Sequence, residues 1–167
     1  LLPSGNDAAI ALSQTVTATT QQFAALMNLD AAKLHLWHTH YVTPNGFDTP
    51  GQVTTARDLA NLTRAAMQIP TFAAIVHTRR WTAYSSSGRG VHVWQNLNKL
   101  LWSSRVVDGV KTGTTPAAGA CLVSSARSGG KWVIAVNMGS SVAARFNDGA
   151  ALLNYGLTVD GTAPSTR

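Results

Sequence analysis

The chain has 167 residues, which fits one domain with a sizeable core. Its 45% hydrophobic and 12% charged residues argue against a chain that is disordered as a whole or forms a coiled coil. No apolar run approaches the roughly 18–20 residues of a membrane span. The formal net charge is +6, but the basic residues are scattered, with Arg79-Arg80 the only adjacent pair, so we expect no nucleic-acid partner.

The chain opens with sequence that favours helices. Ser4 and Asn6 are cap-type residues ahead of positions 7–12, which are strong helix formers. Apolar residues recur at helical spacing after Thr19 and Thr20, and this pattern predicts a second helix that begins at one of these threonines.

A loop that contains prolines and glycines follows at 39–54. Thr55 then caps a third predicted helix, whose apolar residues share one face. Pro70 either ends this helix or starts another short one, because proline is tolerated in the first turn of a helix.

The periodicity then becomes that of strands. Residues 81–84 and 91–94 look extended, and the Ser/Gly-rich stretch 85–90 between them predicts a hairpin. Three further strands are expected at 106–112, 120–126 and 132–138. The order of helices followed by antiparallel strands predicts an α+β fold.

The last predicted element is an amphipathic helix over 142–155, with Gly156 as its stop. We therefore expect one domain over residues 1–156 and a flexible tail over 157–167.

Metal chemistry is not favoured by the residue pattern. The single cysteine, Cys121, cannot form an internal disulfide. His35, His38 and His40 lie within six positions but lack the glutamate of an HExxH motif, so we predict neither a metal site nor a cofactor.

Two short motifs carry the chemistry. The Ser4-Gly5-Asn6 triplet stands at a helix entrance, and the Lys111-Thr112-Gly113 triplet ends a strand. An S-x-N element and a K-T-G element, together with S-x-x-K, form the signature of β-lactamases and penicillin-binding proteins. Either triplet alone is an ordinary helix cap or strand end, but their flanks at 3–9 and 107–115 add specificity.

In these motifs and flanks the chain resembles the serine D-alanyl-D-alanine carboxypeptidases, which are low-molecular-mass penicillin-binding proteins. Further matching stretches lie at 27–28, 39–41, 44–46, 117–126, 145–146 and 152–156. The resemblance implies a penicillin-binding/β-lactamase-like fold, with a helical cluster packed on an antiparallel sheet. It also implies an extracytoplasmic enzyme that removes the terminal D-alanine from peptidoglycan stem peptides and binds β-lactams, without a cofactor.

The resemblance also implies roles for the residues of the first motif and for the lysine of the second. Ser4 would take part in proton transfer to the leaving D-alanine, and Asn6 would hydrogen-bond the substrate amide. Lys111 would add positive potential beside Ser4 and the terminal carboxylate of the substrate.

The remaining implied roles concern substrate binding. The Thr112 hydroxyl would bind the terminal carboxylate, and Gly113 would let the substrate backbone lie against the strand edge. The N–H of Thr114 would donate to the oxyanion, and Arg145 would recognise the carboxylate or support the site.

The chain departs from the family pattern in its first residues. The nucleophile of the family lies in an S-x-x-K motif upstream of S-x-N, whereas only three residues precede Ser4 here. Ser128 and Lys131 form the only S-x-x-K match, but a Gly-Gly turn lacks the helix N-terminus that this chemistry needs. We expect this chain to lack the nucleophile, its lysine and the N-terminal strands, and to be inactive alone, with the missing segment as a candidate partner chain.

The chain also differs from the family pattern at two local positions. Thr114 stands where many relatives carry histidine, and Leu97 where many carry arginine.

A catalytically dead peptidoglycan-binding module is the first alternative function. A basic scaffold or nucleic-acid protein, in which the motifs are accidental, is the second.

Overall fold

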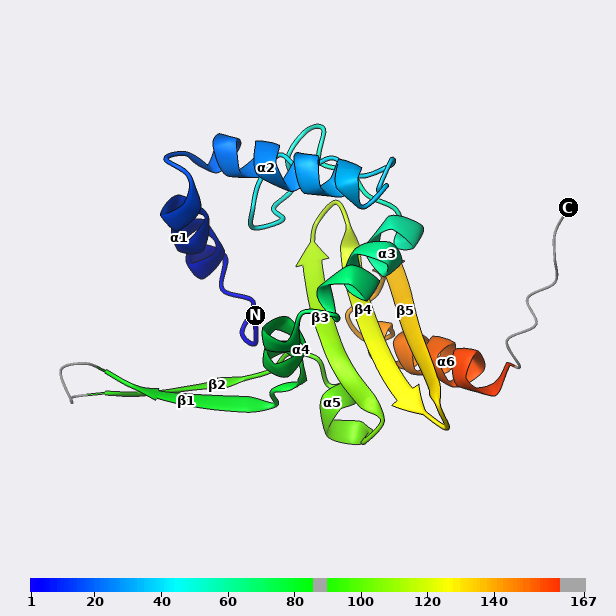
Figure 1. Ribbon diagram of the computed structural model, residues 1–167. Helices are drawn as coiled ribbons and strands as arrows, with labels where there is room; N and C mark the ends of the chain where they lie inside the picture. Colours follow the sequence, from blue (N-terminus) through cyan, green and yellow to red (C-terminus); the bar gives the residue numbers. More distant parts are fainter. Residues whose placement is uncertain (86–89, 160–167) are drawn as a thin grey trace, which may run out of the picture.

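The computed structural model describes residues 1–85 and 90–159, and its elements follow the predicted α+β order (Figure 1). The helices are α1 (Asn6–Val16), α2 (Thr20–Lys33), α3 (Ala56–Ala66), α4 (Pro70–His77), α5 (Leu100–Ser103) and α6 (Arg145–Thr158). The strands are β1 (Arg80–Tyr84), β2 (Val91–Gln95), β3 (Val107–Thr115), β4 (Gly119–Ser128) and β5 (Lys131–Ser140).

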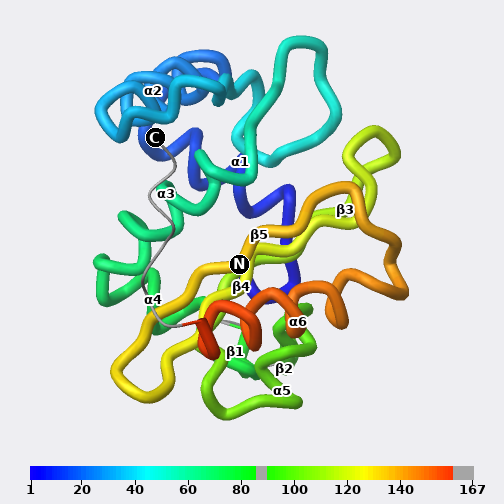
Figure 2. Tube along the Cα trace, turned by 90° about the vertical axis from the view of Figure 1, so that its right-hand side faces the viewer, coloured from blue at the N-terminus to red at the C-terminus, as the bar shows by residue number. Residues whose placement is uncertain are grey.

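A three-stranded antiparallel sheet in the order β3-β4-β5 forms the centre of the molecule. Helix α6 lies on one face of the sheet and α3 and α4 lie on the other (Figure 2). The outer edges of β3 and β5 have no strand partner among the described residues. The predicted hairpin is formed by β1 and β2, which pair only with each other and project to one side (Figure 1).

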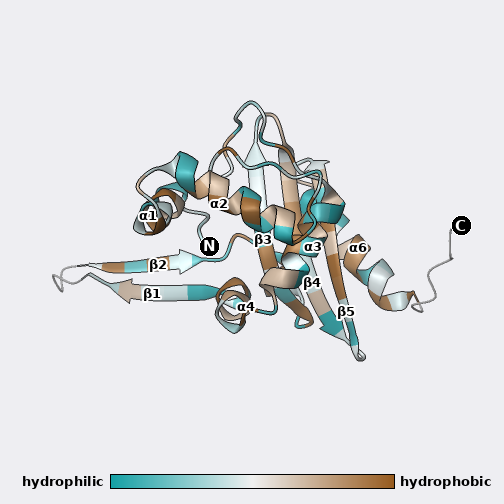
Figure 3. Cartoon of the chain, turned by 45° about the horizontal axis from the view of Figure 1, so that its top comes forward, coloured by the Kyte–Doolittle hydropathy of each residue, from teal (hydrophilic) through white to brown (hydrophobic). Residues whose placement is uncertain are grey.

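Each face of the sheet has its own apolar core. Leu101 and Leu122 are fully buried in the cluster under α6, and Val76 and Val110 are buried in the cluster under α4. Figure 3 shows β5 hydrophobic over much of its length, while α3 alternates between polar and apolar segments. Apolar clusters therefore cover both faces of the sheet, and two serines of the central strand, Ser124 and Ser125, are buried with them.

Helix starts follow the predicted caps in two cases and differ in a third. Thr19 and Gln22 form a capping box before α2, and the Thr55 side chain caps α3. Proline at its first position opens α4, which decides between the two alternatives for Pro70. The prediction for α1 was wrong, because Gly5 is its N-cap and no side chain caps it.

The expected stop at Gly156 was also wrong, since α6 continues to Thr158. A Cβ on Gly156 would lie 2.6 Å from Cγ1 of Val133, and one on Gly149 would lie 2.7 Å from Cδ2 of Leu122. Close packing of the helix on the sheet therefore accounts for both glycines. Leu157, assigned by sequence to the tail, packs against the core, and residues 160–167 lie outside the described part of the chain.

The first two helices form a separate layer. Helices α1 and α2 pack on each other, whereas α3, α4 and α6 pack on the sheet. No helix in the described ranges is long and apolar enough to cross a membrane.

Candidate active site

The two motifs singled out by sequence meet in the structure. The Nζ of Lys111 donates a hydrogen bond to Oγ of Ser4 at 2.6 Å, although the two residues are 107 positions apart. Lys111 also donates to the carbonyl oxygen of Thr112 at 2.6 Å. The contact joins the segment before α1 to the outer edge of β3, so a serine hydroxyl and an amine lie side by side.

The Ser4 backbone adopts an unusual conformation. Its φ is +57°, and its N–H donates to the carbonyl oxygen of Leu1 at 3.2 Å. The left-handed region costs a non-glycine residue about 1–2 kcal/mol, so the surrounding contacts must hold it there. The turn points the Ser4 hydroxyl at Lys111 instead of at the N-terminus of α1, which explains why Ser4 is no helix cap.

Asn6 is the first residue of α1 and is half-buried. Its side chain makes no hydrogen bond with any residue that the structure describes, so its amide is available to a ligand. The structure thus brings Ser4 onto Lys111 directly, while Asn6, two positions after Ser4, has no side-chain hydrogen bond to the part of the chain that is described.

The environment of Lys111 disfavours its charged form. Burial lowers the pKa of the Lys111 amine, and the nearby positive charge of Arg145 lowers it further. At a given pH a larger share of this amine is therefore neutral than in an exposed lysine. A lowered pKa makes the amine release its proton more readily, which suits a group that exchanges protons with a neighbouring hydroxyl.

Buried asparagines fix the strand that carries Lys111. The amide of Asn98 donates to the carbonyl oxygen of Gly109 at 2.9 Å, and the Asn98 N–H donates to Oδ1 of Asn96 at 2.9 Å. Asn98 is only 1% exposed. Sequence reasoning missed this role, although the Asn-x-Asn spacing between apolar stretches was a visible signal.

The edge of β3 after Lys111 is open to a ligand. Thr112 is nearly buried, with no hydrogen-bond partner for its hydroxyl in the described ranges, while Gly113 and Thr114 are exposed. A Cβ built on Gly113 would meet no described atom within 4 Å. Because side chains alternate along a strand, Lys111 and Thr112 point to opposite faces and reach a common ligand only at the strand edge.

Arg145, at the start of α6, supports this edge. It donates from Nη1 to the carbonyl oxygen of Gly113 at 3.2 Å and to Oγ1 of Thr114 at 2.7 Å. Its guanidinium also lies 4.9 Å from the ring centre of Phe146. Its buried Nε has no partner among the described residues. Arg145 therefore holds the strand edge and brings a second positive charge to the site.

Ser128 and Lys131 lie at the opposite end of the sheet. They face each other across the β4–β5 turn, and Nζ of Lys131 donates to the carbonyl oxygens of Leu157 and Val159 at 3.1 and 3.0 Å. Lys111 pairs with Val123, so the turn is about 16 Å farther along β4 at ~3.3 Å per residue. This hairpin turn has no helix N-terminus, and it lies far from the contact between Ser4 and Lys111.

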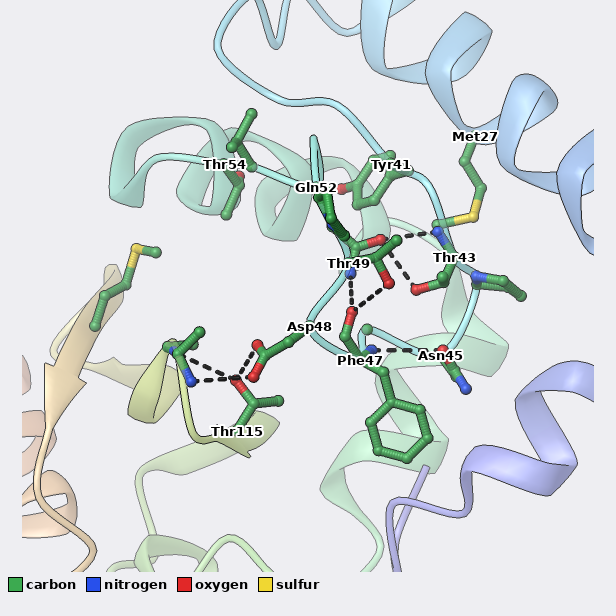
Figure 4. A pocket seen from close by; sticks show the side chains of 17 residues that line it. Met27, Tyr41, Thr43, Asn45, Phe47, Asp48, Thr49, Gln52, Thr54 and Thr115 are labelled. Atoms are coloured by element: carbon green, nitrogen blue, oxygen red, sulfur yellow. Dashed lines mark hydrogen bonds between the residues drawn. The ribbon is translucent and has the colours of Figure 1, made fainter.

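A cavity of about 690 Å³ lies beyond Thr115, between the loop that precedes α3 and the β3–β4 turn (Figure 4). Asp48 reaches across from this loop and accepts a hydrogen bond from Oγ1 of Thr115 at 2.6 Å. The sequence of this loop showed turn residues and the family-like stretches 39–41 and 44–46, and none of these features marked Asp48.

The histidines do not form a metal centre. Within residues 1–85 and 90–159, no group of three or more His, Cys, Asp and Glu side chains could hold a metal ion.

Comparison with known proteins identifies the family. The model of the D-alanyl-D-alanine carboxypeptidase family matches residues 1–142. The chain is 40% identical over 158 residues to the D-alanyl-D-alanine carboxypeptidase DacC of Escherichia coli, an alignment that covers 93% of this chain and 38% of DacC. It is 36% identical over 170 residues to a D-alanyl-D-alanine carboxypeptidase of Streptomyces sp. strain K15, covering 95% of this chain and 58% of that protein.

Solved structures agree. A mutant of the Streptomyces K15 DD-transpeptidase superposes with a TM-score of 0.90 at 36% identity, covering 95% of this chain and 65% of that one. DacD from Francisella tularensis gives 0.85 at 29% identity, with 94% and 50% covered. The predicted penicillin-binding fold is thereby confirmed, and the chain spans about two fifths to three fifths of the two curated relatives described above.

Proposed function

Because the chain belongs to the D-alanyl-D-alanine carboxypeptidase family, we propose that it forms part of a serine hydrolase that removes the terminal D-alanine from peptidoglycan stem peptides. The observation that carries this proposal is the 2.6 Å contact between Ser4 and Lys111 at the free edge of β3. The amine and hydroxyl in contact provide a route for protons beside a strand edge that can hold a peptide.

The proposed reaction is acyl transfer. A serine from an S-x-x-K segment outside residues 1–167 attacks the carbonyl between the two D-alanines and gives its hydroxyl proton to the lysine of that segment. The C–N bond then breaks, an ester remains on the serine, and the nitrogen of the leaving D-alanine takes a proton from the Ser4 hydroxyl. Ser4 regains its proton from the neighbouring amines, and the lowered pKa of Lys111 lets its amine take part. Water then hydrolyses the ester. Residues 1–167 alone are expected to release no D-alanine.

Substrate binding uses the edge of β3. The terminal carboxylate lies near Lys111 and the Thr112 hydroxyl, in the positive potential of Lys111 and Arg145. The Asn6 amide contacts the peptide, and the N–H of Thr114 donates to the oxyanion. The open space beside Gly113 lets the peptide backbone approach the strand. β-Lactams would acylate the same serine, and the enzyme would act in the periplasm or cell envelope.

A direct test compares two peptides that differ only at their end. Residues 1–167 should bind a peptide ending in D-Ala-D-Ala and lose affinity for the same peptide with a C-terminal amide, as followed by NMR shifts of the Lys111–Thr114 amides. Lys111→Met should weaken binding of the acid and leave that of the amide unchanged, and Lys131→Met serves as the matched control. Equal binding of acid and amide would contradict the proposed carboxylate site.

Catalysis is tested with the S-x-x-K segment present. In that form Ser4→Ala should lower D-alanine release by about 10²–10⁴-fold, the range of a lost proton-transfer group. Ser128→Ala should leave release unchanged, because Ser128 lies at the far turn. Release by residues 1–167 alone that survives Ser128→Ala would overturn the proposed location of the nucleophile.

The alternative is a peptidoglycan-binding module that would hold the peptide acid at the free edge of β3 without acyl transfer, and the positive charges of Lys111 and Arg145 at that edge favour it. D-alanine release by the longer protein supports the enzyme, whereas binding without release supports the module.

A further inference from the structure

The Asp48 carboxylate joins the loop before α3 to the sheet through both of its oxygens. Oδ1 accepts a hydrogen bond from Oγ1 of Thr115 at 2.6 Å, and Oδ2 accepts one from the N–H of Ala117 at 3.0 Å. Thr115 Oγ1 in turn accepts from the N–H of Ala118 at 3.1 Å, so one cluster of bonds fixes the whole β3–β4 turn. Figure 4 shows Asp48 and Thr115 pointing toward each other at the side of the cavity.

The loop that presents Asp48 is itself braced. His40 and Val53 close its base with two backbone hydrogen bonds of 2.9 and 3.0 Å. Inside it, Oε1 of Gln52 accepts from the N–H and hydroxyl of Thr43 at 2.9 and 3.0 Å, and Nε2 of Gln52 donates to the carbonyl oxygen of Phe47 at 2.9 Å. A closed loop with internal bonds can hold Asp48 in place, although the Asp48 side chain lies at the surface.

The hydrogen bonds of Asp48 to Thr115 and Ala117, called the Asp48 tie below, lie near the candidate active site along β3. Thr115 directly follows Thr114, and it lies four residues beyond Lys111, about 13 Å along the strand at ~3.3 Å per residue. The edge of β3 is therefore held at two places, at Lys111 by Ser4 from the segment before α1 and at Thr115 by Asp48 from the loop before α3. Between these two points lie Thr112, Gly113 and Thr114.

We propose that Asp48 is a positioning residue for acyl transfer, which fixes the end of β3 so that the N–H of Thr114 and the edge at Gly113 face the bound peptide. This role rests on the proposed function. Asp48 touches neither the peptide nor the serine. Loss of the Asp48 side chain would free the β3–β4 turn and let the strand edge move relative to Ser4. Small displacements of catalytic groups lower the rate of the chemical step much more than they weaken binding.

The experiment uses the protein that carries residues 1–167 together with the S-x-x-K segment, and a fluorescent penicillin as the probe. Asp48→Ala and Thr115→Val should each lower the rate of acylation at saturating penicillin by roughly tenfold, with little change in the half-saturating concentration. The double variant should lose no more than Asp48→Ala alone, because the Asp48–Thr115 bond that Thr115→Val removes is already absent in Asp48→Ala. Asp48→Asn keeps an acceptor oxygen and should recover most of the rate.

Asp30→Asn is the matched control, since Asp30 forms only an exposed ion pair with Lys33 on α2 and should acylate at the unaltered rate. Hydrogen exchange at the Ala117 amide should rise in Asp48→Ala, which verifies that the tie is broken. Unaltered acylation in Asp48→Ala and Thr115→Val, with faster exchange at Ala117, would overturn the positioning role. If Asp48→Ala does not fold, Thr115→Val decides the question. If the unsubstituted protein is not labelled at all, the proposed function fails first, and this inference fails with it.

Discussion

The sheet and the α1–α2 layer differ in how they are held together. The sheet is covered by apolar side chains on both faces, with Leu122 at 0% exposure in its centre. The α1–α2 layer instead leaves large apolar residues in the open, such as Leu12 at 68% and Leu29 at 58% exposure. Its links to β3 include the polar contacts of Ser4 and Asp48.

The candidate active site lies between these two regions. Lys111 and Thr112 belong to the tightly packed sheet, whereas Ser4 and Asn6 belong to the layer of α1. The relative position of the two motifs therefore depends in part on single hydrogen bonds, such as the one between Lys111 and Ser4. Substitutions at such bonds can alter the site geometry without opening the apolar core of the sheet.

The largest expected effect is a difference in the free energy of unfolding between two separate leucine-to-alanine variants, one in each region. Leu122→Ala should lower the free energy of unfolding by about 2–5 kcal/mol, because it opens a cavity in a packed core. Leu12→Ala on α1 should change it by less than about 0.5 kcal/mol, since that side chain is exposed. Urea unfolding of both variants measures the difference, and equal losses would end the distinction between the regions.

A smaller effect is expected at the start of α2. Thr19→Ala removes the capping box and should cost about 0.5–2 kcal/mol of helix stability. The loss should appear as faster hydrogen exchange in α2 and not in β4, because α2 packs on α1 and is not among the helices that pack closely on the sheet. Thr20→Ala, which removes only a side-chain contact to Gln21, is the control. Faster exchange in β4 as well would mean that the two regions unfold as one unit.

The smallest expected effect is electrostatic and crosses the boundary between α6 and β3. Arg145→Gln removes a positive charge near Lys111, so the pKa of Lys111 should rise toward its usual range, and burial should keep it from returning fully. An NMR titration of the Lys111 side chain measures this shift, with exposed Arg57→Gln as the control. An unchanged or lowered pKa would contradict the coupling.

The same shift sets the sign of a pH effect on stability. Between the lowered pKa of folded Lys111 and its pKa in the unfolded chain, the unfolded state binds more protons, so the free energy of unfolding rises with pH in that window. Arg145→Gln narrows the window and should make this rise smaller, as urea unfolding at several alkaline pH values would show.

Part of this architecture could be predicted from sequence because the signals were local. Alternation of apolar and polar residues, together with turn residues, predicted the strands around Lys111. The two motif triplets predicted that Ser4 and Lys111 would lie close together. Gly156 was misread because a glycine near a helix end usually marks a stop, and only the position of Val133 reveals its packing role. Asp48 could not be recognised, since its importance lies in a partner 67 residues away.

The two glycines of α6 have a consequence for engineering. Exchanging helical glycine for alanine is a common route to thermostable variants, because it restricts the unfolded chain. Here the added methyl group at Gly149 would press on Leu122 and lift the helix, whose first residue is Arg145. A stabilising substitution chosen by rule would thus withdraw the guanidinium from β3, and a thermostability programme for this scaffold should leave α6 unaltered.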